Sequence, residues 1–315
     1  MTRTWTMVTI GLLCTLVLCG SYLGIIAYAQ QGSTQQWTPV FEAFVYHAKV
    51  TPQGTLHWVD MKDIHRLAVA AFSPLQTMPT LGKNYQPKVA INAGFFDPAN
   101  GLAASYGQPS VWVDGSRSMV ATLSPFSPED NPRLTNNEGL KPYWEAIQNR
   151  SELRLLQCPR TALAPEYRAS IQRHNDPVSS GCTVDARIGA GPQLLPTLTA
   201  EDERFYAQGG KRDPIGVYRS AARSGVGLRP DGTVVIVLGQ RTPTAKGQTP
   251  GWTLPQFAQA FEDLGATQAM ALDGGSSSSL WIQDEAHPKG QWIEGMRDAK
   301  GQPVRRPIHS VLWLR

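Results

Sequence analysis

The chain has 315 residues, of which 41% are hydrophobic and 17% charged, and its formal net charge is +4. This balance is typical of a globular protein with enough apolar material for a sizeable core, in one large domain or two of ordinary size. Because the charge is small and no dense run of lysine and arginine occurs, we expect no nucleic-acid partner.

The N-terminal segment predicts export. An almost uncharged apolar stretch runs from Met7 to Ala29, and its last three residues match the small-x-small pattern that precedes a signal-peptide cleavage site. We expect residues 1–29 to be a cleaved signal peptide. An uncleaved membrane anchor and a lipid-modified Cys19 are the alternatives, the latter disfavoured because a bulky leucine precedes the cysteine. Each version places the protein in the periplasm or outside the cell.

Cleavage after Ala29 would leave two cysteines, Cys158 and Cys182. They lie in a loop-rich region of an exported chain, so we predict one disulfide, with two buried free thiols as the alternative. Two cysteines with scattered histidines lack the ligand spacing of a zinc site. We expect no cofactor, and a requirement for a divalent ion stays open.

The remaining chain predicts one α+β domain. Residues 30–39 resemble a polar linker, and residues 40–315 contain no further boundary. Strands joined in hairpins with few helices predict a central twisted sheet, mainly antiparallel or mixed. In the first half of the chain we expect a strand meander over 40–72, a strand ending at Asn92, a hairpin over 106–123 turning at Asp114-Gly115 and a loop over 124–137. A short helix over 143–150, a strand over 154–158 and an irregular segment over 159–180 should follow. The last part should contain a helix over 201–208, a hairpin turning at 230–232, a helix over 253–264 and a C-terminal strand.

The helix over 253–264 determines the setting of the most informative stretch. Thr253 and Gln256 form a capping box, and Gly265 is a typical C′ glycine. The following run, QAMALD, predicts a short buried strand. Asp273 should therefore lie at the C-terminal end of a strand, where the backbone opens onto a surface.

The turn after Asp273 is rich in glycine and serine. Gly274 and Gly275 allow backbone conformations that point several N–H groups into one concavity, and the hydroxyl groups of Ser276 to Ser279 surround it. Such a nest suits an oxyanion such as phosphate. A tight turn without a function is the alternative.

Three further positions interrupt or end predicted strands. Asn92 precedes the tight turn at Gly94, and its amide would either close that turn or bind a ligand hydroxyl. Gly191 breaks a strand-like segment, which indicates backbone passing close to another group. Arg223 begins the hairpin over 223–240, where it would bind an anion or be a solvated edge charge.

Six blocks in order carry a resemblance: INAGFF, GAGPQLL, RSGVG, TLPQFAQAFEDLGA, LDGGSSSSL and RPIHSVLWL. Over Val40 to the end, the chain resembles the phosphodiester glycosidase family. The resemblance implies a hydrolase that removes a sugar linked through its anomeric carbon to a phosphodiester, giving free sugar and a phosphomonoester. An exported enzyme of this kind would act on phosphate-linked glycans of the cell envelope and would meet the membrane only through an uncleaved N-terminal segment.

The resemblance also implies site residues. Asp273 would be the nucleophile or general base, with Arg223 on the phosphate and Asn92 on the phosphate or a sugar hydroxyl; a metal-binding or turn-holding Asp273 is the alternative. Asp97, Asp185 and Glu201 are candidate second carboxylates, and the stereochemical outcome stays open. The expected substrate-binding or phosphate-binding residues are Gly94, Gly191, Gly274, Gly275, Ser276, Ser277 and Arg306. The chain departs from the family pattern at Ala93, Gly225, Ser276 and Ser310.

Two other functions are compatible with the same residues. A serine hydrolase would use one of Ser276 to Ser279, but the Gly-x-Ser-x-Gly elbow is absent. A non-catalytic envelope module would bind a phosphorylated glycan with the same arginine and serine-rich turn, and its many tryptophans would offer surfaces for sugars. Such a module would not need Asp273.

Overall fold

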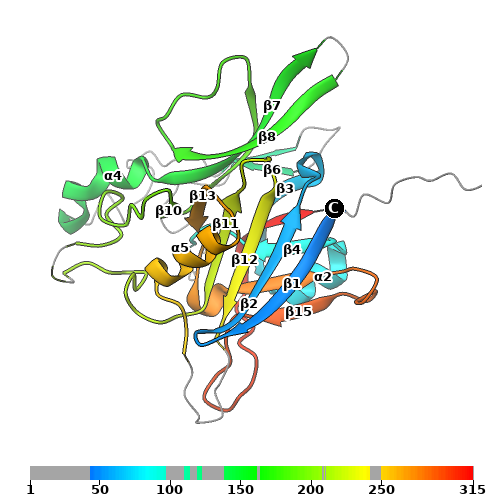
Figure 1. Ribbon diagram of the computed structural model, residues 1–315. Coiled ribbons are helices and arrows are strands. Elements are labelled where there is room, and N and C mark those ends of the chain that lie inside the picture. The colour runs from blue at the N-terminus through cyan, green and yellow to red at the C-terminus, as the bar shows by residue number, and fades with distance from the viewer. Residues whose placement is uncertain are drawn as a thin grey trace, which may run out of the picture. The chain divides into compact units, whose positions relative to one another are not determined.

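The computed structural model describes residues 43–96, 110–113, 119–122, 138–161, 164–207, 209, 211–241 and 250–314 (Figure 1). All of them belong to one compact unit, Ala43–Arg315. The predicted leader (1–29), linker (30–39), loop (124–137) and turn at Asp114-Gly115 lie outside the described residues. Within the described part, no helix is long and apolar enough to cross a membrane.

A six-stranded antiparallel sheet contains two hairpins, formed by the first two strands of the predicted meander and by the strands that flank the predicted turn at 230–232, and β2 of the first pairs with β12 of the second. The meander prediction is wrong for its third strand, because β3 (Leu67–Gln76) pairs with the C-terminal strand in another sheet. Figure 1 shows the two hairpins, blue and yellow, side by side. In sheet order the strands are β1 (Phe44–Thr51), β2 (Gly54–Met61), β12 (Val234–Gln240), β11 (Arg223–Leu228), β13 (Gln268–Ala271) and β10 (Gln193–Leu195).

A second sheet of five strands is also antiparallel throughout. Its C-terminal strand is buried at every position and lies between two others, because IHSVLWL has side chains suited to burial on both faces. In sheet order the strands are β15 (Gln291–Glu294), β14 (Ser279–Ile282), β4 (Val89–Asn92), β16 (Ile308–Leu314) and β3 (Leu67–Gln76).

The third sheet contains the predicted disulfide, which joins Cys158 of β7 to Cys182, the residue before β9. One parallel bridge, between β6 and β9, makes this sheet mixed. In sheet order the strands are β5 (Ser110–Val113), β6 (Met119–Thr122), β9 (Thr183–Gly189), β7 (Ser151–Thr161) and β8 (Ala164–Arg173).

Few helices accompany the sheets, as expected for the α+β class. The capping box of Thr253 and Gln256 is formed at the start of α5, and Gly265 follows its end with φ +79°. The described helices are η1 (Ile64–Arg66), α2 (Met78–Tyr85), η3 (Glu138–Tyr143), α4 (Trp144–Gln148), α5 (Leu254–Asp263) and η5 (Gly275–Ser277).

The core lies between the sheets and extends under the two longer helices. The run VVIVL of strand β12 is continuously apolar because both faces of the strand are buried. Val234, Ile236 and Leu238 face the cluster shared by the three sheets, whereas Val235 and Val237 face α5. On the outer face of the second sheet, α2 packs through Leu81 against Trp281 and Trp313.

Two further predictions are wrong, the first of them in part. Most of the segment predicted to be irregular over 159–180 is a hairpin, because β7 continues to Thr161 and β8 pairs with it from Ala164 to Arg173, whereas residues 174–180 lie outside the strands as expected. Ala169 and Ile171 of β8 are two residues apart and pack on the central core, which is strand periodicity within a polar-looking sequence. Residues 201–207 form turns where the sequence predicts a helix over 201–208, because Arg204 has φ +56° and the carboxylate of Glu203 accepts hydrogen bonds from main-chain N–H groups of other segments.

Gly225 of β11 lies directly beneath α5, and this contact gives a test of the packing. A Cβ atom at this position would lie 2.9 Å from ring carbons of both Phe257 and Phe261. We expect Gly225→Ala to lower the free energy of unfolding by about 1–3 kcal/mol because the core is already filled. Urea denaturation measures this, and Gly225→Ala combined with Phe257→Leu should recover part of the loss. An unchanged stability would contradict the packing described for α5.

Candidate active site

The ends of strands from two sheets meet around Asp273. Its N–H group donates to the carbonyl of Ala93, the residue after β4, at 2.8 Å. The neighbouring Leu272 N–H donates to Ser224 of β11 at 2.8 Å. Asp273 is therefore anchored to the second sheet on one side and to the six-stranded sheet on the other, at the end of β13 as the sequence predicts.

The side chain of Asn92 joins the same elements. Its exposed fraction is only 1%, and its amide nitrogen donates to the carbonyl of Asp273 at 2.6 Å. Its amide oxygen accepts from the Ser224 hydroxyl at 2.7 Å and from the Ser279 N–H at 3.0 Å. Both lone-pair positions of the oxygen are used, and none of these partners belongs to the turn at Gly94. The amide therefore does not close its own turn, as one of the two predictions had it, but joins strand ends that are distant in the chain.

The carboxyl group of Asp273 is half-buried beside its own turn. Removal from water raises its pKa to about 6, although hydrogen bonds from the Ser277 hydroxyl and the Gly274 N–H and the nearby charge of Arg306 act in the opposite direction. A carboxylate of this kind is ionised at neutral pH and is a stronger base than an ordinary aspartate. Both properties suit a nucleophile or a general base.

The glycine-serine turn holds the aspartate more than it forms an open nest. The N–H group of Gly275 donates to Ala222, and those of Ser277 and Ser278 donate to carbonyls within the turn. Gly275 itself has φ +62°, which requires glycine. These N–H groups are already satisfied, and the hydroxyl groups of Ser277 and Ser279 donate to Asp273 and to the Ser277 carbonyl, not to a histidine.

Arg223 lies next to this turn but is directed into the protein. Its exposed fraction is 4%, and its guanidinium donates to four main-chain carbonyls, those of Ile215, Gly216, Arg219 and Trp252. Burial lowers its pKa to about 10, so it remains charged at neutral pH. With four of its five N–H groups used, Arg223 holds the segment 215–219 against β11 and is neither a solvated edge charge nor an open fork for phosphate.

Arg306 is the arginine that approaches the carboxylate from outside. It is half-buried, its charge acts on Asp273, and its guanidinium carbon lies 5.9 Å from the centre of the Phe96 ring. Gly94 is buried and donates its N–H to the Ser310 hydroxyl at 3.1 Å. Gly94 thus supports the site through β16.

Gly191 is part of the support beneath Asp273. Its N–H group donates to the carbonyl of Ala271 at 3.0 Å, two residues before the aspartate. A Cβ atom at Gly191 would lie 2.6 Å from a carboxylate oxygen of Glu203 and 3.2 Å from the Phe205 ring. This close approach explains why a glycine interrupts the strand-like sequence at position 191.

The structure adds hydroxyl groups that the sequence did not single out as partners. The Ser224 hydroxyl donates to Asn92 and the Ser310 hydroxyl accepts from Gly94, whereas Ser279 contacts Asn92 through its main-chain N–H. A single serine in a strand gives no signal of its own, although Ser310 was visible as a departure from the family pattern. Of the candidate second carboxylates, Asp185 and Glu201 are exposed on β9 and on the turn at 201–204, and Asp97 lies outside the described residues.

No cluster of three or more His, Cys, Asp or Glu side chains in the described ranges could hold a metal ion.

The comparison with protein families is decisive for the identity of this arrangement. The model for phosphodiester glycosidases matches residues 85–315, which include every group described around Asp273. The chain belongs to the phosphodiester glycosidase family. A comparison with curated proteins gives no match.

Two solved structures are similar to this phosphodiester glycosidase at low sequence identity, and the first of them supports the fold. The catalytic domain of zebrafish N-acetylglucosamine-1-phosphodiester alpha-N-acetylglucosaminidase, auto-inhibited by its pro-peptide, is 15% identical, with a TM-score of 0.53 over 86% of this chain and 82% of that one. A hypothetical protein from Synechocystis is 19% identical, with a TM-score of 0.48 over 89% of this chain and 63% of that one.

The buried amide of this phosphodiester glycosidase gives a second test. We expect Asn92→Ala to lower the free energy of unfolding by about 2–4 kcal/mol, because it leaves buried partners on two sheets without a hydrogen bond. Asn149→Ala is the matched control: the Asn149 side chain accepts one exposed hydrogen bond from Asn175, so its loss should cost under about 1 kcal/mol. Equal losses in the two variants, measured by urea denaturation, would contradict the joining role of Asn92.

Proposed function

We propose that this phosphodiester glycosidase hydrolyses the bond between the anomeric carbon of a sugar and a phosphodiester. The observation that carries the proposal is the half-buried carboxylate of Asp273, whose pKa is raised to about 6 and which faces the charge of Arg306. The shared fold with an enzyme named for an N-acetylglucosamine-1-phosphodiester supports the class of bond.

The reaction needs few groups because the leaving group is a phosphate ester. The bond between the anomeric carbon and the phosphate oxygen breaks, its electron pair stays on that oxygen, and a water oxygen becomes bonded to the carbon. The products are free sugar and a phosphomonoester. Since a phosphate ester is a weak base, the departing oxygen needs little help from a general acid.

Asp273 supplies the basic or nucleophilic group in this proposal. Either its carboxylate attacks the anomeric carbon and water later hydrolyses the sugar ester, or it takes a proton from the attacking water. The Gly274 N–H and Ser277 hydroxyl hold the carboxylate in one orientation for either route. Proton NMR of the first sugar product distinguishes the two, because nucleophilic attack retains the anomeric configuration and direct attack of water inverts it.

Arg306 supplies the charge that the phosphate requires. Its guanidinium can donate two parallel hydrogen bonds to phosphate oxygens, and the half-buried Ser276 of the turn after Asp273 offers a hydroxyl group. Arg223 is assigned a supporting role, because its N–H groups already bind carbonyls of the protein. Asn92 likewise holds the strand ends and does not contact the sugar.

The apolar leader and the disulfide support an exported enzyme. We propose that residues 40–315 act as one domain outside the cytoplasm, on phosphate-linked glycans of the cell envelope. Incubation of the mature form with envelope extracts tests this, and the absence of any released sugar or phosphomonoester would count against it.

Asp273→Asn should reduce the rate of sugar release from a sugar-1-phosphodiester such as UDP-N-acetylglucosamine by at least about a hundredfold. The parent should show kcat/KM falling about tenfold per pH unit below pH 6, because protonation removes the carboxylate. Sugar release by Asp273→Asn at the parent rate would remove Asp273 from the mechanism.

The stability of the same variant is the control for folding. The folded-state pKa of about 6 lies above the unfolded value near 3.9, so protonation stabilises the fold below about pH 4 and this stabilisation is lost as the pH rises through 6. The ionised carboxylate therefore costs stability at pH 7. Asp273→Asn, which has no charge, should have a Tm at pH 7 equal to or above that of the parent.

Arg306→Ala should lower kcat/KM by on the order of tenfold to a hundredfold, because the phosphate loses a charged donor. Arg305→Ala is the matched control, since the neighbouring guanidinium lies 5.4 Å from the Trp292 ring centre and has no role in the proposal. Initial rates with the same substrate measure both. Equal effects of the two substitutions would contradict the role of Arg306.

A non-catalytic module that binds phosphorylated glycans is the alternative. Binding of a sugar-1-phosphodiester that survives Asp273→Asn, without turnover by the parent over a panel of sugars, would favour it.

A further inference from the structure

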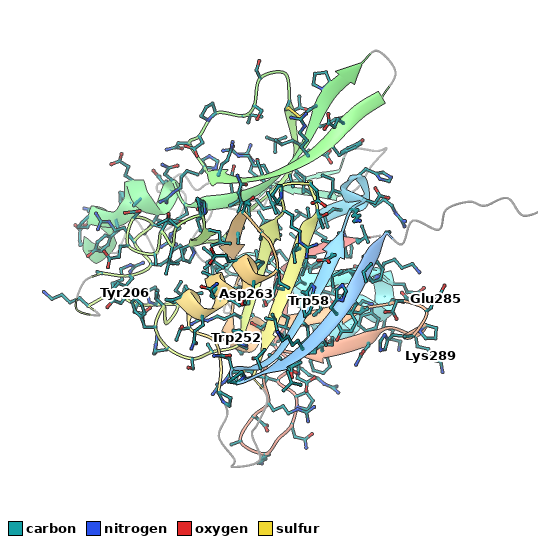
Figure 2. The ribbon with its side chains drawn as sticks, viewed as in Figure 1. Trp58, Tyr206, Trp252, Asp263, Glu285 and Lys289 are labelled. Atoms are coloured by element: carbon teal, nitrogen blue, oxygen red, sulfur yellow. A yellow bond between two sulfur atoms is a disulfide. The ribbon has the colours of Figure 1, made fainter. Side chains whose placement is uncertain are left out.

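A cavity of about 450 Å³ lies between the β1–β2 hairpin and α5, on the outer face of the six-stranded sheet. We call it the tryptophan groove, after the two indoles that line it. Figure 2 labels three of its residues, Trp58, Trp252 and Asp263, beside α5. The groove residues that matter here are Lys49, Trp58, Trp252, Gln256, Gln259 and Asp263.

The two indoles are held rigidly. The ring of Trp58 stacks on His47, with centres 4.8 Å apart and an angle of 16° between the planes. Trp252 is 4% exposed and packs edge-on against Phe257, with 6.3 Å between the two ring centres. On its other side, a Cβ at Gly239 would come within 2.7 Å of the indole. Trp252 is therefore a buried part of the groove wall, and the half-buried Trp58 is the indole that can present a flat surface to a ligand. Flat, fixed aromatic surfaces bind the apolar faces of rigid ligands at little entropic cost.

The polar side chains around the indoles present both donors and acceptors. The Gln256 oxygen accepts from the N–H and hydroxyl of Thr253, so its amide nitrogen is left as the donor. The Gln259 nitrogen donates to Glu262 and Asp263 at 3.0 Å, so its oxygen is left as an acceptor. Lys49 adds donors and Asp263 adds acceptors.

These features select among classes of ligand. A hydroxyl group both donates and accepts, so a hydroxyl-rich molecule satisfies alternating donors and acceptors better than a phosphate or a carboxylate, which only accept. One lysine and one aspartate also give the groove no net charge, unlike a nucleic-acid surface. A sugar ring combines such hydroxyl groups with apolar faces that match the indoles.

We propose that the tryptophan groove binds a neutral oligosaccharide, at a site separate from the turn of Asp273. The two sites are connected, because the carbonyl of Trp252 accepts from Arg223 Nε at 2.9 Å. The segment that forms one wall of the groove therefore also holds the arginine beside the candidate active site. Binding in the groove does not depend on the proposed hydrolysis. A role of the groove in holding a glycan substrate near Asp273 does depend on that reaction.

Isothermal titration calorimetry of the mature protein tests binding directly, with tetrasaccharides of N-acetylglucosamine, of α-1,4-linked glucose and of β-1,4-linked glucose as probes. At least one should bind with a Kd in the millimolar range or tighter. Trp58→Ala should weaken that binding about tenfold or more. Trp292→Ala, which removes a tryptophan from β15 outside the groove, is the matched control and should leave the Kd unchanged.

Because Trp58 also packs on the core beneath α5, a second variant avoids the risk of unfolding. Gln259→Ala with Asp263→Ala changes only exposed positions of α5 and should also weaken binding severalfold. Hydrolysis of a small sugar-1-phosphodiester should be the same in this double variant as in the parent, whatever its rate.

Several results would overturn the inference. They are no heat of binding with all three tetrasaccharides at millimolar concentration, an unchanged Kd in both groove variants, and tighter binding of an acidic tetrasaccharide of galacturonic acid than of the neutral probes. Binding that is lost in the groove variants, from a protein without hydrolytic activity, would support the groove while contradicting the proposed reaction.

Discussion

One buried amide joins the parts on which the candidate site depends. Asn92 donates to the carbonyl of Asp273 and accepts from Ser224 and Ser279, so a single side chain links β4, β11, the glycine-serine turn and β14. Loss of any of these partners would leave a buried polar group without a hydrogen bond, which costs free energy. The planar amide therefore constrains the positions of the two sheets relative to each other. The position of Asp273 follows from this constraint and from its own N–H bond to Ala93.

The protein treats its buried charges in two different ways. Arg223 and Glu203 are almost completely enclosed, and each is surrounded by groups of opposite polarity: four carbonyls for the arginine, and N–H and hydroxyl donors of Ser151, Thr199 and Gln193 for the glutamate. Both stabilise turns that support the site. Asp273 has fewer donors, and its raised pKa records that its charge is only partly compensated. We expect a reactive group where a buried charge has too few hydrogen-bond partners, because a charged group with all its partners in the protein cannot also bind a substrate.

Local patterns in the sequence predicted the elements that local physics determines. The capping box of α5, the hairpin of β11 and β12 and the position of Asp273 after β13 each depend on residues close together in the chain. The sequence could not reveal the direction of Arg223, because its carbonyl partners belong to segments that only the fold brings near. The same applies to Glu203, whose tertiary partners override the helical periodicity of its segment. It also applies to β8, whose contribution to the core is limited to Ala169 and Ile171.

The place of β16 between β4 and β3 has a consequence for how the site comes into being. Ser310 of this strand accepts from both Ala93 and Gly94, so the turn after β4 has all of its described hydrogen-bond partners only when residues 308–314 are in place. During synthesis these residues leave the ribosome roughly two hundred positions after β4. A nascent chain therefore contains the aspartate, glycines and serines of the candidate site before the strand that completes their support has been made.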